Sequence, residues 1–167
     1  MEEIVNKVAA SGLVTINLEE FYPAGDRVSI DLAEQLWQGL ALREKDFRSW
    51  IQTHDWSQYQ GKHVAVFCSV DAIIPAWAFM LVASALSDYA VTVVQGNRNE
   101  LEEVLFRNVV DGLDVTVYQD KRCVVKGCSN LPVPQSAYTH LVVRLRPVVR
   151  SIMFGEPCST VPVYKRG

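Results

Sequence analysis

The sequence lacks an excess of basic residues and a long apolar run. Its 167 residues contain 16 Lys and Arg against 19 Asp and Glu, which gives a net charge of −3. Proteins that bind nucleic acid usually carry a basic excess, so we expect no nucleic-acid partner. The most apolar stretch, residues 72–86, contains Pro75 and Ser84. Because it is too short to cross a bilayer, we expect no membrane association.

A secretion signal is also lacking, because the start, MEEIVNKVAASG, is acidic and amphipathic. This predicts a cytoplasmic location, where cysteines stay as thiols or bind metals rather than forming disulfides. Neither GxGxxG nor GxxxxGK[ST] occurs, so no dinucleotide or nucleoside triphosphate site is predicted. The composition, with 49% hydrophobic and 21% charged residues, is typical of a soluble globular protein. The length predicts a single domain over residues 1–167.

From residue 55 onward, apolar runs of strand length alternate with amphipathic helical patterns. This predicts an α/β fold with a mainly parallel sheet. The predicted strands are 63–67, 91–95, 122–126 and 151–154, and the predicted helices are 75–86, 101–110 and 134–145. Residues 1–54 are predicted as a small N-terminal α/β flanking segment, with helices at 2–10 and 43–52 and a strand at 13–18. Residues 156–167 are predicted as a C-terminal arm or edge strand, because Pro162 removes a ladder donor.

The sequence also contains an internal repeat, in which Asp55 aligns with Asp114. Residues 55–96 align without a gap on 114–155 and share nine identities in 42 positions, where composition alone gives roughly two or three. We interpret the two segments as duplicated βαβ units, although any two such units share a hydrophobic pattern. Joined side by side, they predict a three-layer sandwich with strand order 2-1-3-4 and a ligand crevice at the carboxyl ends of the strands. The predicted core is the apolar face of helix 75–86 together with Val64, Val66, Val91, Val93, Val124 and Ile152.

Three of the four cysteines lie just past the ends of predicted strands. Cys68, Cys128 and Cys158 come after residues 67, 126 and 154, whereas Cys123 lies within a strand and is predicted to be buried in the core. Adjacent strands are about 4.8 Å apart, so the single predicted sheet brings the three thiols to one edge. With Asp71 or Glu156 as a further ligand, they would suit zinc or an iron–sulfur cluster.

Two other interpretations of these cysteines remain open. Free cysteine packs like a small hydrophobic residue, so all of them can be structural. In the second interpretation Cys68 is a reactive thiol, because it precedes a helix whose N-terminus can lower a thiol pKa. That interpretation needs a base, and by topology only His54 among the three histidines could approach Cys68.

The longest local motifs are CSVDAIIPAWA, from Cys68, and GEPCSTVPVYK, from Gly155. With them the chain resembles, over nearly its whole length, the bacterial family known only as domain of unknown function 2480. The resemblance implies a small bacterial protein with no assigned activity and defines no catalytic residues. Two functions are therefore expected as alternatives. One is an auxiliary metal- or iron–sulfur-binding protein, and the other is a non-catalytic interaction or scaffold protein that contacts a protein partner or a second copy of itself.

Overall fold

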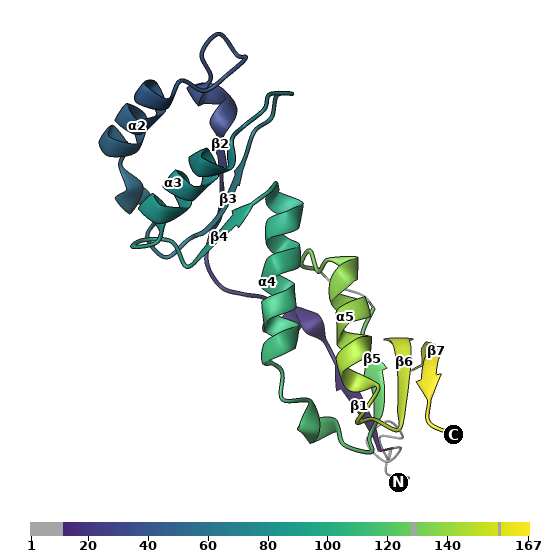
Figure 1. Ribbon diagram of the computed structural model, residues 1–167. Coiled ribbons are helices and arrows are strands. Elements are labelled where there is room, and N and C mark those ends of the chain that lie inside the picture. Colours follow the sequence, from purple (N-terminus) through teal and green to yellow (C-terminus); the bar gives the residue numbers. More distant parts are fainter. Residues whose placement is uncertain (1–11, 128–129, 157) are drawn as a thin grey trace. The chain divides into compact units, whose positions relative to one another are not determined.

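A computed structural model describes residues 12–127, 130–156 and 158–167. It has an α/β fold in which the strands are mostly parallel and form two sheets (Figure 1). The chain divides into two compact units. Unit 2 is the continuous segment Ala24–Val104, and unit 1 combines the residues up to Pro23 with Leu105–Gly167.

Unit 2 is built on a three-stranded parallel sheet with the order β2-β3-β4. The strands are β2 (Arg27–Asp31), β3 (His63–Phe67) and β4 (Thr92–Gln95). The helices α2 (Glu44–Thr53) and α3 (Ala76–Leu86) pack on this sheet, and single turns of 3-10 helix lie at Leu32–Gln35 and Trp56–Tyr59.

The core of unit 2 follows from the sequence pattern of these elements. Val64 and Val66 of the central strand are buried, as a strand covered on both faces requires. Phe47 of α2 and Val82 of α3 pack into the same cluster. In α2 the apolar residues lie on one face of the helix. In contrast, α3 is apolar at nearly every position, and its buried residues Ala78, Val82 and Leu86 recur every four residues along one face.

Unit 1 is built on a four-stranded sheet with the order β1-β5-β6-β7. The strands are β1 (Leu13–Ile16), β5 (Arg122–Val125), β6 (Ser151–Glu156) and β7 (Ser159–Lys165), of which only β7 runs antiparallel to its neighbour. The helix α5 (Gln135–Leu145) and the part of α4 (Arg98–Gly112) that belongs to unit 1, from Leu105 onward, lie side by side against this sheet (Figure 1). Single turns of 3-10 helix lie at Leu18–Phe21 and Val115–Tyr118.

The predicted strand order 2-1-3-4 is wrong. Strands 63–67 and 122–126 were expected to be neighbours, but β3 and β5 lie in different sheets. Each sheet instead recruits a strand from the N-terminal flanking segment: β1 pairs with β5, and β2 pairs with β3. Periodicity identifies a strand but not its partner, and the expectation that consecutive units share one sheet failed for this reason. The predicted three-layer sandwich required all these strands to lie in a single sheet, so it is not confirmed either.

The two units nevertheless repeat the same order of elements when 55–96 is aligned on 114–155. β3, α3 and β4 correspond in this way to β5, α5 and β6. Asp55 and Asp114 begin the equivalent 3-10 turns, and each carboxylate accepts a hydrogen bond from the N–H two residues on, at 3.0 Å. The correspondence also extends beyond the predicted repeat, because α2 matches the second half of α4, with Phe47 and Phe106 buried at equivalent positions.

A second and shorter internal correspondence relates β1 to β2. VTINLEE at residues 14–20 corresponds to VSIDLAE at 28–34, and Ile16 and Ile30 are both buried. The registers agree, because Ile16 pairs with Val125 and Ile30 pairs with Val66, the counterpart of Val125 in unit 2. Each sheet therefore begins with an equivalent strand followed by an equivalent 3-10 turn.

Several individual predictions can be compared with the structure. β2 was missed, whereas the tail is confirmed as the edge strand β7. Val64, Val66, Val124 and Ile152 are buried as predicted, but Val91 is 65% exposed because it precedes the edge strand β4. The predicted helix 2–10 lies outside the described residues. Among those that are described, no helix is long and apolar enough to cross a membrane.

Candidate functional site

The cysteines predicted to share a metal do not follow strands of one sheet. Cys68 comes after β3 of unit 2, and Cys158 lies between β6 and β7 of unit 1. Cys158 is exposed, and the Cys68 thiol donates a hydrogen bond to the carbonyl of Val70 at 3.5 Å. Cys128 lies outside the described residues. The prediction of a common sheet edge, which was the geometric argument for the metal site, is therefore wrong.

The two predicted carboxylate ligands are divided in the same way. Asp71 is exposed in the loop after β3, and Glu156 is half-buried at the end of β6. Within residues 12–127, 130–156 and 158–167, no group of three or more His, Cys, Asp and Glu side chains could hold a metal ion. Cys123 is fully buried as predicted, and burial raises the pKa of its thiol to about 11.

His54, the one histidine that topology left free to approach Cys68, has other neighbours. The His54 Nε2 atom lies 3.0 Å from the hydroxyl of Tyr59, and its ring packs against Trp50 and Trp56. A base for nucleophilic catalysis must lie within hydrogen-bond reach of the thiol. The observed contacts of His54 serve the aromatic cluster of unit 2 instead.

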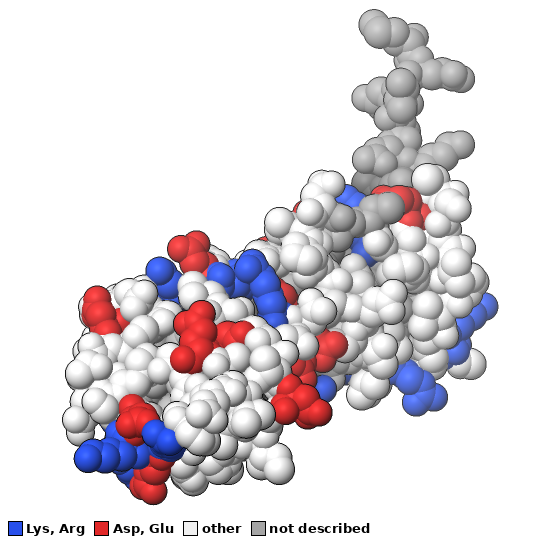
Figure 2. Space-filling view, turned by 90° about the horizontal axis from the view of Figure 1, so that it is seen from above, with Lys and Arg blue, Asp and Glu red and all other residues white. Residues whose placement is uncertain are grey.

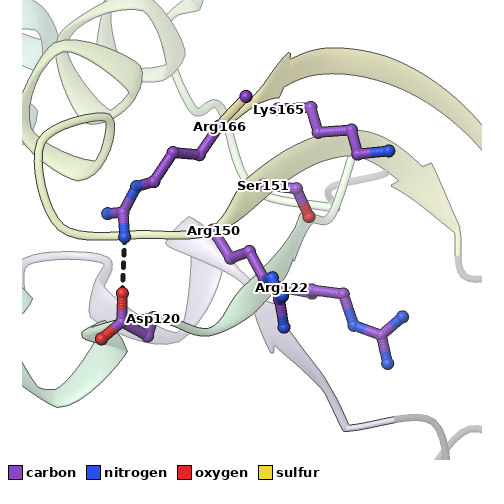
Figure 3. A pocket seen from close by; sticks show the side chains of 7 residues that line it. Asp120, Arg122, Arg150, Ser151, Lys165 and Arg166 are labelled. Atoms are coloured by element: carbon purple, nitrogen blue, oxygen red, sulfur yellow. Dashed lines mark hydrogen bonds and ion pairs between the residues drawn. The ribbon is translucent and has the colours of Figure 1, made fainter.

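The structure reveals a different candidate site, a basic pocket at one edge of the sheet of unit 1. The cavity has a volume of about 780 Å³. Its lining carries four positive side chains and one negative side chain, together with Ser151 and Gly167. The charged residues are Asp120, Arg122, Arg150, Lys165 and Arg166 (Figure 3).

The sheet register explains why cations so distant in sequence meet. Arg122 begins β5 and pairs with Ser151 at the start of β6, which in turn pairs with Lys165 at the end of β7. Their neighbours Cys123 and Ile152 pack in the core below α4 and α5. Because side chains alternate along a strand, Arg122, Ser151 and Lys165 lie on the opposite face of the sheet.

Arg150 and Arg166 complete the pocket from the residues that flank these strands. The N–H of Arg166 donates to the carbonyl of Arg150 at 2.9 Å, which fixes the two backbones beside each other. Figure 3 shows Arg122 and Arg150 in the same pocket, with the Arg122 guanidinium directed away from that of Arg150. The pocket therefore gathers several guanidinium groups, which attract anions.

Asp120 is the acidic member of the pocket, and its carboxylate is engaged with Arg166. Nη1 of Arg166 donates to Oδ1 of Asp120 at 2.6 Å, and Nη2 donates to the carbonyl of Val148 at 3.1 Å. The hydrogen bond from Arg166 holds the pKa of Asp120 below its usual value. Asp120 also has a positive φ of 56° at the position that corresponds to Gly61, where φ is 72°. Aspartate tolerates this left-handed conformation better than most residues.

The corresponding edge of unit 2 is chemically different. His63 stands where unit 1 has Arg122, and Thr92 stands where it has Ser151. The ring of His63 is buried, with Nδ1 3.0 Å from the Thr92 hydroxyl and Nε2 2.7 Å from the carbonyl of Ala24. This end of the unit 2 sheet therefore carries a buried His63–Thr92 contact in place of Arg122 and Ser151.

The basic pocket contrasts with the mixed charge elsewhere. On the face drawn in Figure 2, blue and red side chains are interspersed among uncharged ones, so the described residues there form no continuous basic surface. Sequence reasoning missed the pocket because its cations come from residues 122, 150, 165 and 166. The signal that could have found it is an antiparallel pairing of the tail with strand 151–154. Such a pairing places the end of the tail beside the start of that strand.

Comparison with known proteins adds a family but no activity. No curated protein and no solved structure matches the chain. The family model described as "Protein of unknown function (DUF2480)" matches residues 2–166. Since this match covers nearly the whole sequence, the chain belongs to the DUF2480 family.

Proposed function

We propose that the protein is a non-catalytic interaction protein whose basic pocket binds an oxyanion group, a phosphate or a carboxylate, of its partner. The observation that carries this proposal is the composition of the lining: four cationic side chains and one carboxylate around a cavity of about 780 Å³. Arg122, Arg150 and Lys165 are exposed, so an anion reaches them without a rearrangement of the core.

The chemistry of the lining favours an oxyanion over a simple halide. The planar guanidinium group presents paired N–H donors that match two oxygens of a carboxylate or phosphate. Lys165 adds a mobile point charge, and the hydroxyl of Ser151 adds a donor. Because the cations are exposed, their attraction for an anion is screened by salt. We therefore expect binding to weaken as ionic strength rises.

The proposal is tested by titrating the full chain with inorganic phosphate, and separately with acetate, at low ionic strength. Backbone and arginine side-chain NMR signals report the site. We expect saturable shifts at Arg122, Arg150 and Lys165, and a smaller effect at high salt. The double variant Arg150→Gln/Lys165→Gln should weaken the apparent affinity at least tenfold, because each charge-assisted hydrogen bond contributes about 1.5–3 kcal/mol.

The matched control is Lys45→Gln/Arg107→Gln, which removes the same charge from exposed positions outside the pocket. The phosphate affinity of this control should stay within about twofold of the wild-type value, since distant exposed charges are largely screened. Equal losses in the two double variants would show a general charge effect and would overturn the proposal. Absence of any saturable shift would overturn it as well. A response to phosphate and not acetate identifies the group as a phosphate.

The alternative is the metal- or iron–sulfur-binding protein predicted from Cys68, Cys128 and Cys158. Elemental analysis and a visible spectrum of protein purified without oxygen decide between the two functions. Stoichiometric zinc or iron that disappears in Cys68→Ser and Cys158→Ser variants would establish the metal function. The internal correspondence supports a related inference, that the chain arose by duplication of one α/β unit and that the anion pocket developed in unit 1 alone.

A further inference from the structure

The sheet of unit 1 has one strand more than the sheet of unit 2. β7 pairs antiparallel with β6, on the side of β6 away from β5. β4 is the counterpart of β6, and among the described residues no strand pairs with its outer side. At the end of β4, the N–H of Gly96 donates to the carbonyl of Val66 on the β3 side at 2.9 Å. Because N–H groups alternate in direction along a strand, those of Val94 and Thr92 face β3 as well, and those of Val93 and Gln95 face the outer side.

Beside each of the strands β4 and β6 is an apolar hollow against the preceding helix of the same unit, α3 or α5. The hollow of unit 2 has a volume of about 240 Å³ and that of unit 1 about 190 Å³. Six lining residues of the first correspond, in the alignment of 55–96 on 114–155, to six of the second: Val66, Phe79, Met80, Ala83, Val93 and Gln95. In unit 1 the seventh lining residue is Val163, which β7 supplies.

We propose that the outer edge of β4 binds an extended segment of a partner protein, which takes the place in unit 2 that β7 takes in unit 1. The segment runs antiparallel to β4 and places a β-branched side chain in the hollow lined by Phe79, Met80 and Ala83. Binding by addition of a strand to an exposed sheet edge uses main-chain hydrogen bonds for affinity and side-chain hollows for specificity.

The pairing of β7 defines the chemistry of this partner segment. Tyr164 lies opposite Ile152 and packs on the core of unit 1, so an aromatic residue is expected opposite Val93. The preceding position, which corresponds to Val163, supplies the residue for the hollow. Pro162 lies opposite Met153, so a proline is tolerated opposite Val94. A segment of the type Val-Pro-Val-Tyr satisfies these positions.

The surface of unit 2 is consistent with a docking site. Met80, which lines the hollow, is 69% exposed, and Val91 beside the edge is 65% exposed. Isolated exposed apolar residues are ordinary, but here they flank an unpaired strand edge within the described residues, and proteins usually protect such an edge with charge, proline or a covering element. The four residues of β4, Thr-Val-Val-Gln, carry neither charge nor proline.

The test uses the full chain and the capped peptide Ser-Thr-Val-Pro-Val-Tyr-Lys, the sequence of β7. In a 1H–15N NMR titration we expect saturable shifts at Thr92–Gln95 and along α3, with an affinity of about 1 mM or tighter. The variant Met80→Glu should weaken binding at least tenfold. Its matched control, Thr139→Glu at the corresponding exposed position of α5, should change the peptide affinity less than twofold. A peptide with Asp in place of its second Val should bind at least tenfold more weakly.

Three outcomes would overturn the proposal. One is the absence of saturable shifts in β4. Another is a response confined to β6 and α5, which would mean that the peptide only exchanges with β7. The third is a second copy of the chain on this edge. Sedimentation would then show a dimer that Met80→Glu converts to a monomer, and the outward-facing amide of Val93 would exchange slowly before any peptide is added. The double variant Arg150→Gln/Lys165→Gln should bind the peptide normally, which separates this proposal from the anion site.

Discussion

The carboxylate of Asp31 connects the end of β2 to the N–H of Ser69, in the loop that follows β3. Its Oδ1 atom accepts hydrogen bonds from the N–H groups of Ala33 at 2.9 Å and Ser69 at 3.0 Å. Asn17 has the equivalent capping role in unit 1, where its Oδ1 accepts from Glu19 N–H at 3.1 Å. Burial raises the pKa of Asp31, but hydrogen bonds from Ser69 and Ala33 together outweigh it and place the pKa below the usual 3.8.

Replacing Asp31 by alanine should lower the free energy of unfolding by about 1–2 kcal/mol at neutral pH, because two backbone donors lose their acceptor. The lowered pKa means that the folded state favours the carboxylate. Its stabilisation is therefore present above pH 3.8 and is lost as the pH falls through the folded-state pKa. Urea unfolding of the wild type and the Asp31→Ala variant at several pH values measures both effects.

The amide variant Asp31→Asn is the matched control. Asparagine preserves the cap, as Asn17 does in unit 1, so this variant should retain most of the stability at pH 7 and lose the acid dependence that Asp31 contributes. A difference between wild type and Asp31→Asn that stays constant from pH 7 to well below 3.8 would contradict the assigned ion–dipole role.

The Arg27–Glu102 pair should be important for the stability of unit 2. Nε of Arg27 donates to Oε1 of Glu102 at 2.7 Å, and the two side chains are only 5% and 10% exposed. Removing one member of a buried ion pair leaves an uncompensated charge, so Glu102→Ala should cost about 3–5 kcal/mol. Denaturant unfolding measures this. A double variant, Arg27→Met/Glu102→Leu, should recover much of the loss.

The exposed pair Arg48–Glu44 provides the comparison for this experiment. Its atoms are 3.0 Å apart, but the side chains are 53% and 63% exposed. Solvent screens such a pair, so Glu44→Ala should change the free energy of unfolding by about 0.5 kcal/mol or less. A comparable loss in Glu102→Ala and Glu44→Ala would refute the role of burial.

Phe47 and Phe106 occupy equivalent positions in α2 and α4 and are fully buried in the cores of unit 2 and unit 1, respectively. Each Phe→Ala substitution should cost about 3–5 kcal/mol, from lost transfer free energy and the cavity that remains. Hydrogen exchange followed by mass spectrometry should show faster exchange chiefly in the unit that carries the substitution. Equal acceleration in both units from either variant would mean that the two cores unfold as one.

The thiol of Cys123 should resist modification in the folded protein. Burial raises its pKa to about 11, so only about 0.1% is thiolate at pH 8. Cys158 is exposed and should react first with a disulfide reagent. Peptide mapping after a timed reaction distinguishes them, and Cys123 should react fully only in denaturant. Labelling of Cys123 as fast as Cys158 in native protein would contradict its placement in the core.

The sequence predicted local structure better than long-range pairing. The strand 63–67 was predicted with its observed bounds, and the helix 75–86 was predicted within one residue of α3. Both contain apolar residues at the spacing that their core contacts require. β2 was missed because Arg27–Asp31 has two charged residues and a serine among its five and follows a turn with Pro23 and Gly25. Such a strand obtains its stability from its neighbour β3 rather than from its own hydrophobicity.

The candidate site could not be predicted from local patterns at all. The proposed metal ligands were chosen because each follows a strand, but a sheet edge is shared only when the strands belong to one sheet. Cys68 and Cys158 follow strands of different sheets. The cations of the basic pocket meet through the registers Arg122–Ser151 and Ser151–Lys165, which are set by tertiary pairing. Backbone pairing, rather than the type of residue, therefore decides which charges become neighbours.

The interrupted order of unit 1 also has a consequence for synthesis on the ribosome. Leu13 of β1 pairs with Arg122 of β5, so this strand waits for a partner while the whole of Ala24–Val104 is translated. Unit 2 has all its strands by residue 95 and can condense cotranslationally. Unit 1 cannot close its sheet until β6 and β7 emerge, and its distant β1–β5 contact carries a high loop-closure cost. The nascent chain is therefore expected to fold from its middle outward, with its two ends joining last.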